Sequence, residues 1–331
     1  MSQSKVRRTS WAGWLVSALL IIGSIWLWSE RQYVVDAIQY SQYDPPSAVE
    51  TIATDTGLTD DARFTFYATR PAVEPSQSFN QHCQRKEADS PILGCYASNR
   101  IYIFDVTDSR LVGIKPVTAA HELLHAEYER LPDSEKKRLQ PLLQAAYEKV
   151  TDASLDARMK YYEKTEPGES FNELHSIIGT EFESIGPELE TYYGRYFKNR
   201  SAIVKLHQKV DETFTSLSEE ADDLVNQIEK LASAINADTA RYNDDIKSLN
   251  QEVESFNTRA SQSGGFTTQS EFQAARQRLV TRSDELNDFR QRIQSNITQY
   301  KSLLAKLDTI NAQSASLNQS LDSTLSDAPK I

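Results

Sequence analysis

The chain has 331 residues, of which 39% are apolar, so it can form one sizeable domain with accessory helices. This apolar content argues against a wholly disordered chain. The formal charge of −11, without any basic stripe, argues against a nucleic-acid-binding protein, whose surface must neutralise phosphates.

An uncharged apolar segment lies near the N-terminus, at residues 11–28. As a helix, these 18 residues would be about 27 Å long, close to the thickness of the membrane hydrocarbon. Lys5, Arg7 and Arg8 precede it and are expected to stay in the cytoplasm. A cleaved signal peptide is the alternative, but Ser-Glu-Arg at residues 29–31 replaces the usual small-residue cleavage site. The sequence therefore predicts a transmembrane anchor with the chain after it outside the cell.

The next segments predict a short helix, a strand and a loop. Residues 47–56 read as a helix, because Ser47 and Glu50 have the spacing of a capping box. Residues 64–68, Phe-Thr-Phe-Tyr-Ala, have the composition of a strand. Residues 71–91 read as a loop.

The only two cysteines, Cys83 and Cys95, fall on the predicted outer side, where disulfides persist. We expect one disulfide that closes a short loop. The spacing argues against a zinc site built on these cysteines, because neither belongs to a CxxC-like arrangement and His82 alone adds too little.

A β-hairpin is predicted from residues 92–96 and 100–106, with a turn at Ser98 and Asn99. A helix with Thr118 as its N-cap then runs to about Leu131, where Pro132 stops it. Three further helices are predicted, at residues 134–150, 155–164 and 167–185.

The helix after Thr118 carries the sequence HELLH at residues 121–125. Two histidines four residues apart project from the same face of a helix, so His121 and His125 can bind one zinc ion. Glu122 is predicted to be the general base, which takes a proton from a water molecule whose pKa the zinc ion lowers. The alternative is a surface helix with two incidental histidines.

Residues 118–126, TAAHELLHA, resemble the active-site helix of the zincin metallopeptidases, in which uncharged residues flank the HExxH motif. Glu127 departs from that pattern, since an apolar residue is usual there. The resemblance implies an α+β zincin-like catalytic domain with a small antiparallel sheet and active-site helices. It also implies a strand beside the active helix that pairs with an extended substrate, for which residues 101–104 are the candidate. An ordinary core strand is the alternative role of these residues.

A catalytic zinc ion needs a third protein ligand and an open position. The longer motif HExxHxxGxxH is absent, because Tyr128 and Leu131 occupy the positions of its glycine and third histidine. The resemblance is therefore to the gluzincin branch, in which a glutamate from a later helix completes the site.

Glu173 is our choice for this third zinc ligand. The alternatives within the same segment are Glu169, His175 and Glu181. In one version Glu169 binds the zinc ion and Glu173 orients a histidine ligand. Tyrosines that could stabilise an oxyanion are Tyr161, Tyr162, Tyr192 and Tyr193.

The last third of the chain repeats apolar residues at intervals of three, four or seven, interrupted by Gly264 and Gly265. This pattern predicts a long antiparallel α-helical coiled-coil hairpin. Its expected role is a rigid spacer, and a surface for a protein partner or for self-association is the alternative.

The sequence thus predicts five segments in a single-pass protein of the cell membrane. They are a cytoplasmic tail (1–10), a transmembrane anchor (11–28), a zincin-like metallopeptidase domain (29–200), a coiled-coil hairpin (201–325) and a tail (326–331).

The predicted function is a membrane-anchored zinc (Zn2+) metallopeptidase that hydrolyses extracytoplasmic protein or peptide, with no nucleic-acid partner. Two alternatives remain open at this point. One is a non-catalytic, membrane-anchored coiled-coil scaffold with a structural or vestigial zinc site. The other is an amidase of cell-wall peptides, because the same zinc chemistry permits it.

Overall fold

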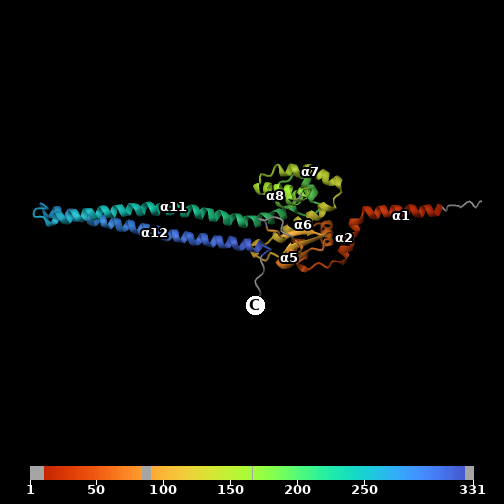
Figure 1. The fold of residues 1–331 in the computed structure, drawn as a ribbon, viewed down its shortest axis with the longest axis horizontal. Coiled ribbons are helices and arrows are strands. Elements are labelled where there is room, and N and C mark those ends of the chain that lie inside the picture. Colours follow the sequence, from red (N-terminus) through yellow and green to blue (C-terminus); the bar gives the residue numbers. More distant parts are fainter. Residues whose placement is uncertain (1–10, 84–90, 166, 325–331) are drawn as a thin grey trace, which may run out of the picture. The chain divides into compact units, whose positions relative to one another are not determined.

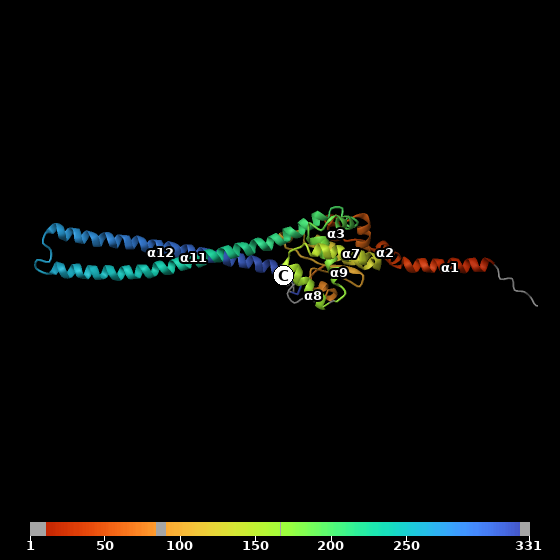
Figure 2. The same ribbon diagram turned by 90° about the horizontal axis from the view of Figure 1, so that it is seen from above.

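A computed structural model of the chain describes residues 11–83, 91–165 and 167–324 (Figures 1 and 2). The chain divides into two compact units. The first contains the described residues up to Thr213 together with those from Asn318 onward, and the second is Phe214–Leu317. The first unit is a mostly helical α+β domain, and it carries every candidate site residue.

Helix α1 (Trp11–Ser29) covers the predicted anchor segment and leads into α2 (Arg31–Gln42). Apolar side chains of α1 such as Leu19 and Ile22 are exposed. Among the helices that the structure describes, none combines the length and the apolar character needed to cross a bilayer.

The predicted strand at residues 64–68 is wrong, because these residues lie in helix α4 (Asp60–Ala68). The Thr59 hydroxyl caps this helix by accepting a hydrogen bond from the N–H of Ala62 at 3.2 Å. Two acidic residues in the first turn also favour the helix, since they oppose the positive end of its dipole. Local start signals therefore outweigh the strand-like composition.

Two predicted helix caps are also wrong, although the helices themselves are confirmed. Helix α3 (Ser47–Asp55) has no side-chain hydrogen bond at its N-terminus, so the capping box of Ser47 does not form. Helix α6 (Ile114–Arg130) begins one turn before Thr118, after Gly113 in a left-handed conformation. The Thr118 hydroxyl donates to the carbonyl four residues earlier, as a residue inside a helix does.

The first unit contains a three-stranded sheet with the order β1-β3-β2. Strands β2 (Gly94–Ala97) and β3 (Arg100–Phe104) form the predicted antiparallel hairpin. Its turn residues Ser98 and Asn99 have φ values of 51° and 61°, as a tight primed turn requires. Strand β1 (Ala72–Glu74) pairs in parallel with β3 and lies in the segment predicted as a loop. The sheet is therefore mixed, and the expectation of an antiparallel sheet is corrected.

Helix α6 lies between the sheet and helix α9 (Ser170–Glu181), and it contacts both. Leu123, Leu124 and Ile178 are fully buried in the shared core. The approach of α9 depends on Gly179, because a Cβ atom there would lie 2.4 Å from the Leu124 side chain. The two helices are thereby close enough to share a site.

The other helices of the first unit frame this core. They are α5 (Ser76–His82), the 3-10 helix η1 (Ser109–Leu111), α7 (Asp133–Tyr147), α8 (Ala153–Thr165) and α10 (Pro187–Tyr193). The three helices predicted after HELLH are confirmed as α7, α8 and α9, whereas α5 and α10 were not predicted. The predicted disulfide between Cys83 and Cys95 is present and joins the end of α5 to β2.

Helices α11 (Arg200–Ser261) and α12 (Gln269–Leu321) form the predicted long hairpin, and their arms lie side by side in Figures 1 and 2. The second unit, which consists of these arms and their connection, has two apolar clusters. One contains Leu249, Leu286, Phe289 and Ile293, and the other contains Leu224, Leu303 and Ile310. Gly264, with a φ of 82°, lies in the connection between the two arms.

Candidate metal centre

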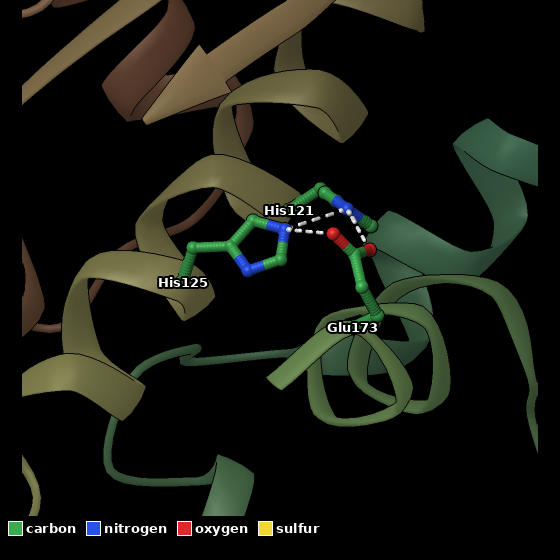
Figure 3. A group of neighbouring side chains, drawn as sticks. All are labelled: His121, His125 and Glu173. Carbon is green, nitrogen blue, oxygen red and sulfur yellow. Dashed lines mark hydrogen bonds and ion pairs between the residues drawn. The ribbon is translucent and has the colours of Figure 1, made fainter. Parts of the chain in front are cut away.

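His121, His125 and Glu173 converge on one point, which α6 and α9 form together (Figure 3). The two histidine Nε2 atoms lie 3.1 Å apart. The carboxylate oxygens of Glu173 lie 3.8 Å from the Nε2 atom of His121 and 3.6 Å from that of His125. The three side chains are only 12–23% exposed, so they are held in place but still reachable from solvent.

These atoms fit a divalent metal ion. Nitrogen and oxygen ligands about 2.0–2.2 Å from a tetrahedral zinc ion lie about 3.3–3.6 Å from one another. The three observed separations fall close to that range, and all candidate ligand atoms lie within 4.8 Å of one another. Two imidazoles and one carboxylate are a donor set typical of catalytic zinc, which keeps its fourth position open.

Glu173 is the acidic residue that the structure brings to the two histidines. Burial alone would raise the pKa of Glu173, but the neighbouring His125 and His121 hold it below its ordinary value. The side chain is therefore a carboxylate, which is the form that binds a metal ion.

The other three candidates point elsewhere. Glu181 forms two hydrogen bonds with the Arg158 guanidinium, at 2.8 and 2.6 Å. The fully buried His175 pairs through Nε2 with the Tyr192 hydroxyl at 2.9 Å. Burial lowers the pKa of His175 to about 3, so its ring is neutral. Glu169 is turned toward Asn172.

Asn172 is a positioning residue that the sequence did not suggest. Its side-chain N–H donates to the carboxylate of Glu169 at 3.0 Å, which leaves its carbonyl oxygen for Nδ1 of His125, also at 3.0 Å. His125 Nδ1 must then carry the proton, and its Nε2 atom presents a lone pair toward Glu173 and His121. Glu169, the alternative ligand, therefore contacts this group only indirectly, through Asn172.

Glu122 lies on the sheet side of α6 and is only 6% exposed. The backbone N–H of Tyr96 in β2 lies near its carboxylate and favours the charged form. Gly94 makes this approach possible, because a Cβ atom there would lie 2.8 Å from the Glu122 carboxylate and 2.5 Å from the Thr118 methyl group. Burial raises the pKa of Glu122 to about 7, and the nearby Glu173 charge adds to the rise against the opposing effect of His125. Such a group can both accept and donate a proton near neutral pH.

The strand beside the site is β2 rather than residues 101–104. Strand β3 pairs on both sides and its residues 101–104 are buried, so of the two roles considered for it the structure supports the core strand and not the substrate-binding edge. In the described part of the chain, β2 pairs only with β3. Along β2, residues whose backbone groups bond to β3 alternate with residues whose backbone groups point away from it. Gly94 and Tyr96 are of the second kind, so their backbone groups face the free edge next to α6.

The tyrosines do not form an evident oxyanion site. Tyr192 and Tyr193 are 2% and 0% exposed, and their hydroxyls bond with His175 and its carbonyl. Tyr161 and Tyr162 lie on α8 with their rings in contact. Their assignment to an oxyanion stays a prediction.

Comparisons with known proteins identify no relative of this chain: no family model, curated protein or solved structure matches it.

Proposed function

We propose that this chain is a zinc-dependent peptidase that cleaves extended protein or peptide segments at the free edge of β2. One observation carries the proposal. A buried carboxylate that is not a ligand, that of Glu122, lies beside a group of three residues that can hold a metal ion. Structural zinc sites are closed by four protein ligands, whereas catalytic sites have three and an adjacent acid–base group.

His121, His125 and Glu173 would hold the ion. A zinc ion supplies a Lewis acid that polarises a carbonyl and makes water more acidic. Glu122 would take a proton from the attacking water and deliver it to the amine nitrogen of the departing segment. The carbonyl carbon gains the hydroxyl as the C–N bond breaks, so the products are a carboxylate and an amine.

The edge of β2 supports a peptide substrate over a small amide. Gly94 and Tyr96 face this edge, and an extended peptide that pairs with it would run past Glu122. Main-chain pairing makes no demand on particular side chains, so we expect broad sequence tolerance at the positions that contact β2.

We further propose that residues 11–28 anchor this domain in a cell membrane, with residues 1–10 in the cytoplasm. Seven apolar side chains of α1, from Trp14 to Ile22, are more than half exposed, so the rest of the chain does not cover them. The disulfide between Cys83 and Cys95 suits an oxidising compartment outside the cytoplasm. Protease protection of tagged termini in intact cells tests this orientation.

The roles of the α11–α12 hairpin as a spacer or as a partner surface stay predictions.

The full-length chain with Glu122→Gln tests the catalytic proposal. We expect zinc content to match the unsubstituted protein, because Glu122 is not a ligand. We also expect cleavage of an unstructured protein such as casein to fall by about 100-fold or more. Metal content by mass spectrometry and product analysis measure the two effects separately. Stoichiometric zinc without cleavage of any peptide would instead favour a non-catalytic scaffold.

A further inference from the structure

Strand β2 contacts α6 at two points. The Tyr96 hydroxyl accepts a hydrogen bond from Nη1 of Arg130 at 3.2 Å, and Gly94 lies against the Glu122 carboxylate, because a Cβ atom there would be 2.8 Å from it. Glu122 and Arg130 are two turns apart on α6, so both face β2. The Tyr96 hydroxyl donates in turn to the Asn99 side chain at 2.7 Å, and Asn99 also accepts from Arg130 at 3.2 Å. The β2–β3 hairpin is thereby fixed to the C-terminal end of α6.

Arg130 is itself fixed by two partners. Its Nε and Nη2 atoms donate to the two carboxylate oxygens of Asp36 at 2.9 and 2.8 Å, and Nη1 donates to the Ala126 carbonyl at 2.7 Å. The side chains of Arg130 and Asp36 are only 11% and 5% exposed. Water screens a buried pair far less than it screens a surface ion pair. The two parallel hydrogen bonds also fix the orientation of the Arg130 guanidinium.

Asp36 connects this arrangement to α2, the helix that directly follows the proposed anchor. It is the one buried residue of α2, and Gln32 of the same helix donates to it at 3.0 Å. Helix α2 also packs on α4, through ring contacts of Tyr33 and Tyr40 with Phe64, but its link toward β2 is this carboxylate. The link runs from Asp36 through Arg130 and Tyr96 to β2, which lies against Glu122.

We propose that Asp36 and Arg130 are positioning residues for the reaction, which keep β2 against the Glu122 carboxylate and make catalysis depend on α2. This inference rests on the proposed peptidase function. None of the positioning residues touches the ligands His121, His125 and Glu173. Loss of the Asp36–Arg130 pair should therefore disturb the general base while metal binding continues.

The test uses the full-length chain and three variants, Asp36→Asn, Arg130→Met and Tyr96→Phe. Hydrogen exchange by mass spectrometry over residues 94–97 reports how firmly β2 is held, without any need for activity. We expect the exchange of this segment to rise about tenfold in each variant, because β2 separates from α6 more often. We expect zinc content to stay unchanged, kcat to fall by about 10- to 100-fold and KM to change little.

Arg200→Met is the matched control. Arg200 is 5% exposed and donates to Glu190 and to the carbonyls of Phe182 and Glu183. Within the part of the chain that the structure describes it makes no hydrogen bond or ion pair with β2, so its loss removes an equally buried guanidinium elsewhere. We expect this control to leave exchange over residues 94–97 and kcat unchanged. Tyr96→Phe removes only the hydroxyl, so it remains informative if Arg130→Met does not fold.

The outcomes separate the inference from the proposed function. Unchanged exchange over residues 94–97 in the three variants overturns the inference, whatever the activity. Raised exchange with an unchanged kcat also overturns it. An unsubstituted protein that binds zinc but cleaves no peptide overturns the proposed function, and the exchange data then still decide whether Asp36 and Arg130 hold Tyr96.

Discussion

The two sides of α6 are built for different tasks. On the α9 side, Glu173 completes the ligand group and Asn172 fixes the orientation of His125. On the sheet side, Gly94 of β2 lies against Glu122. In the proposed function, one helix therefore presents metal ligands to a neighbouring helix and a proton-transfer group to a neighbouring strand. Metal binding and proton transfer should consequently be separable by substitutions on one side or the other.

The largest effect is expected on the α9 side, from Arg158→Met. This change leaves Glu181 as a buried carboxylate without its bidentate partner, which typically costs about 3–5 kcal/mol of unfolding free energy. Burial raises the pKa of Glu181, but in the unsubstituted protein Arg158 outweighs burial and holds it below its ordinary value. Its contribution to stability is therefore present above the unfolded-state pKa, near 4.5, and is lost as the pH falls through the lower folded-state pKa.

The stability difference between the two proteins should accordingly be large at pH 8 and should shrink toward pH 4. Urea unfolding of the metal-free proteins across this range measures it. Arg138→Met, which breaks an exposed pair with Glu135 at one helix surface, is the control and should cost less than about 1 kcal/mol. A pH-independent difference would contradict the role given to Glu181.

Asn172→Ala tests the orientation of His125 on the same side. It removes the acceptor at Nδ1, and second partners of this kind typically contribute about 10- to 100-fold in metal affinity. We expect zinc affinity to fall by that factor, as measured by competition with a chelator of known affinity. Asn172→Asp, which keeps an acceptor, should retain most of the affinity. Equal affinities for all three proteins would show that Asn172 has no such role.

Two glycine substitutions of equal size sharpen the comparison. Gly179→Ala would place a Cβ atom against Leu124 and Tyr193 and push α9 from α6, whereas Gly94→Ala would displace Glu122. Overpacking of this kind costs about 1–3 kcal/mol. We expect Gly179→Ala to weaken zinc binding about tenfold, and Gly94→Ala to reduce peptide cleavage about tenfold with zinc binding retained. The reverse pattern would contradict the division of tasks between the two sides.

Periodic patterns predicted the fold well where one period extends over many residues. The arms of the hairpin were predicted because apolar residues such as Leu249 and Leu286 recur over many turns and meet in the observed clusters. Short segments were less predictable. Residues 64–68 resemble a strand, yet Thr59 and the acidic first turn of α4 make them helical. Strand β1 has only three residues and forms through its pairing with β3, which local sequence does not reveal.

The candidate site was predicted to the extent that it is local in sequence. His121, Glu122 and His125 lie within one stretch of helix, so their spacing alone places them together. Glu173 was one of several acids, and only the packing of α9 on α6 distinguishes it from Glu169. The roles of Asn172, Gly94 and Tyr96 depend on contacts between segments far apart in the chain, and no local pattern marks them.

The most direct test is the metal content of the purified full-length chain, combined with X-ray absorption at the zinc edge. We predict one zinc ion per chain with two imidazole nitrogens and only nitrogen or oxygen neighbours. In Glu173→Ala we predict that affinity falls by more than the roughly 100-fold that indirect partners contribute. A protein without stoichiometric metal, or a Glu173→Ala variant that binds zinc as tightly as the unsubstituted chain, would contradict the central claim.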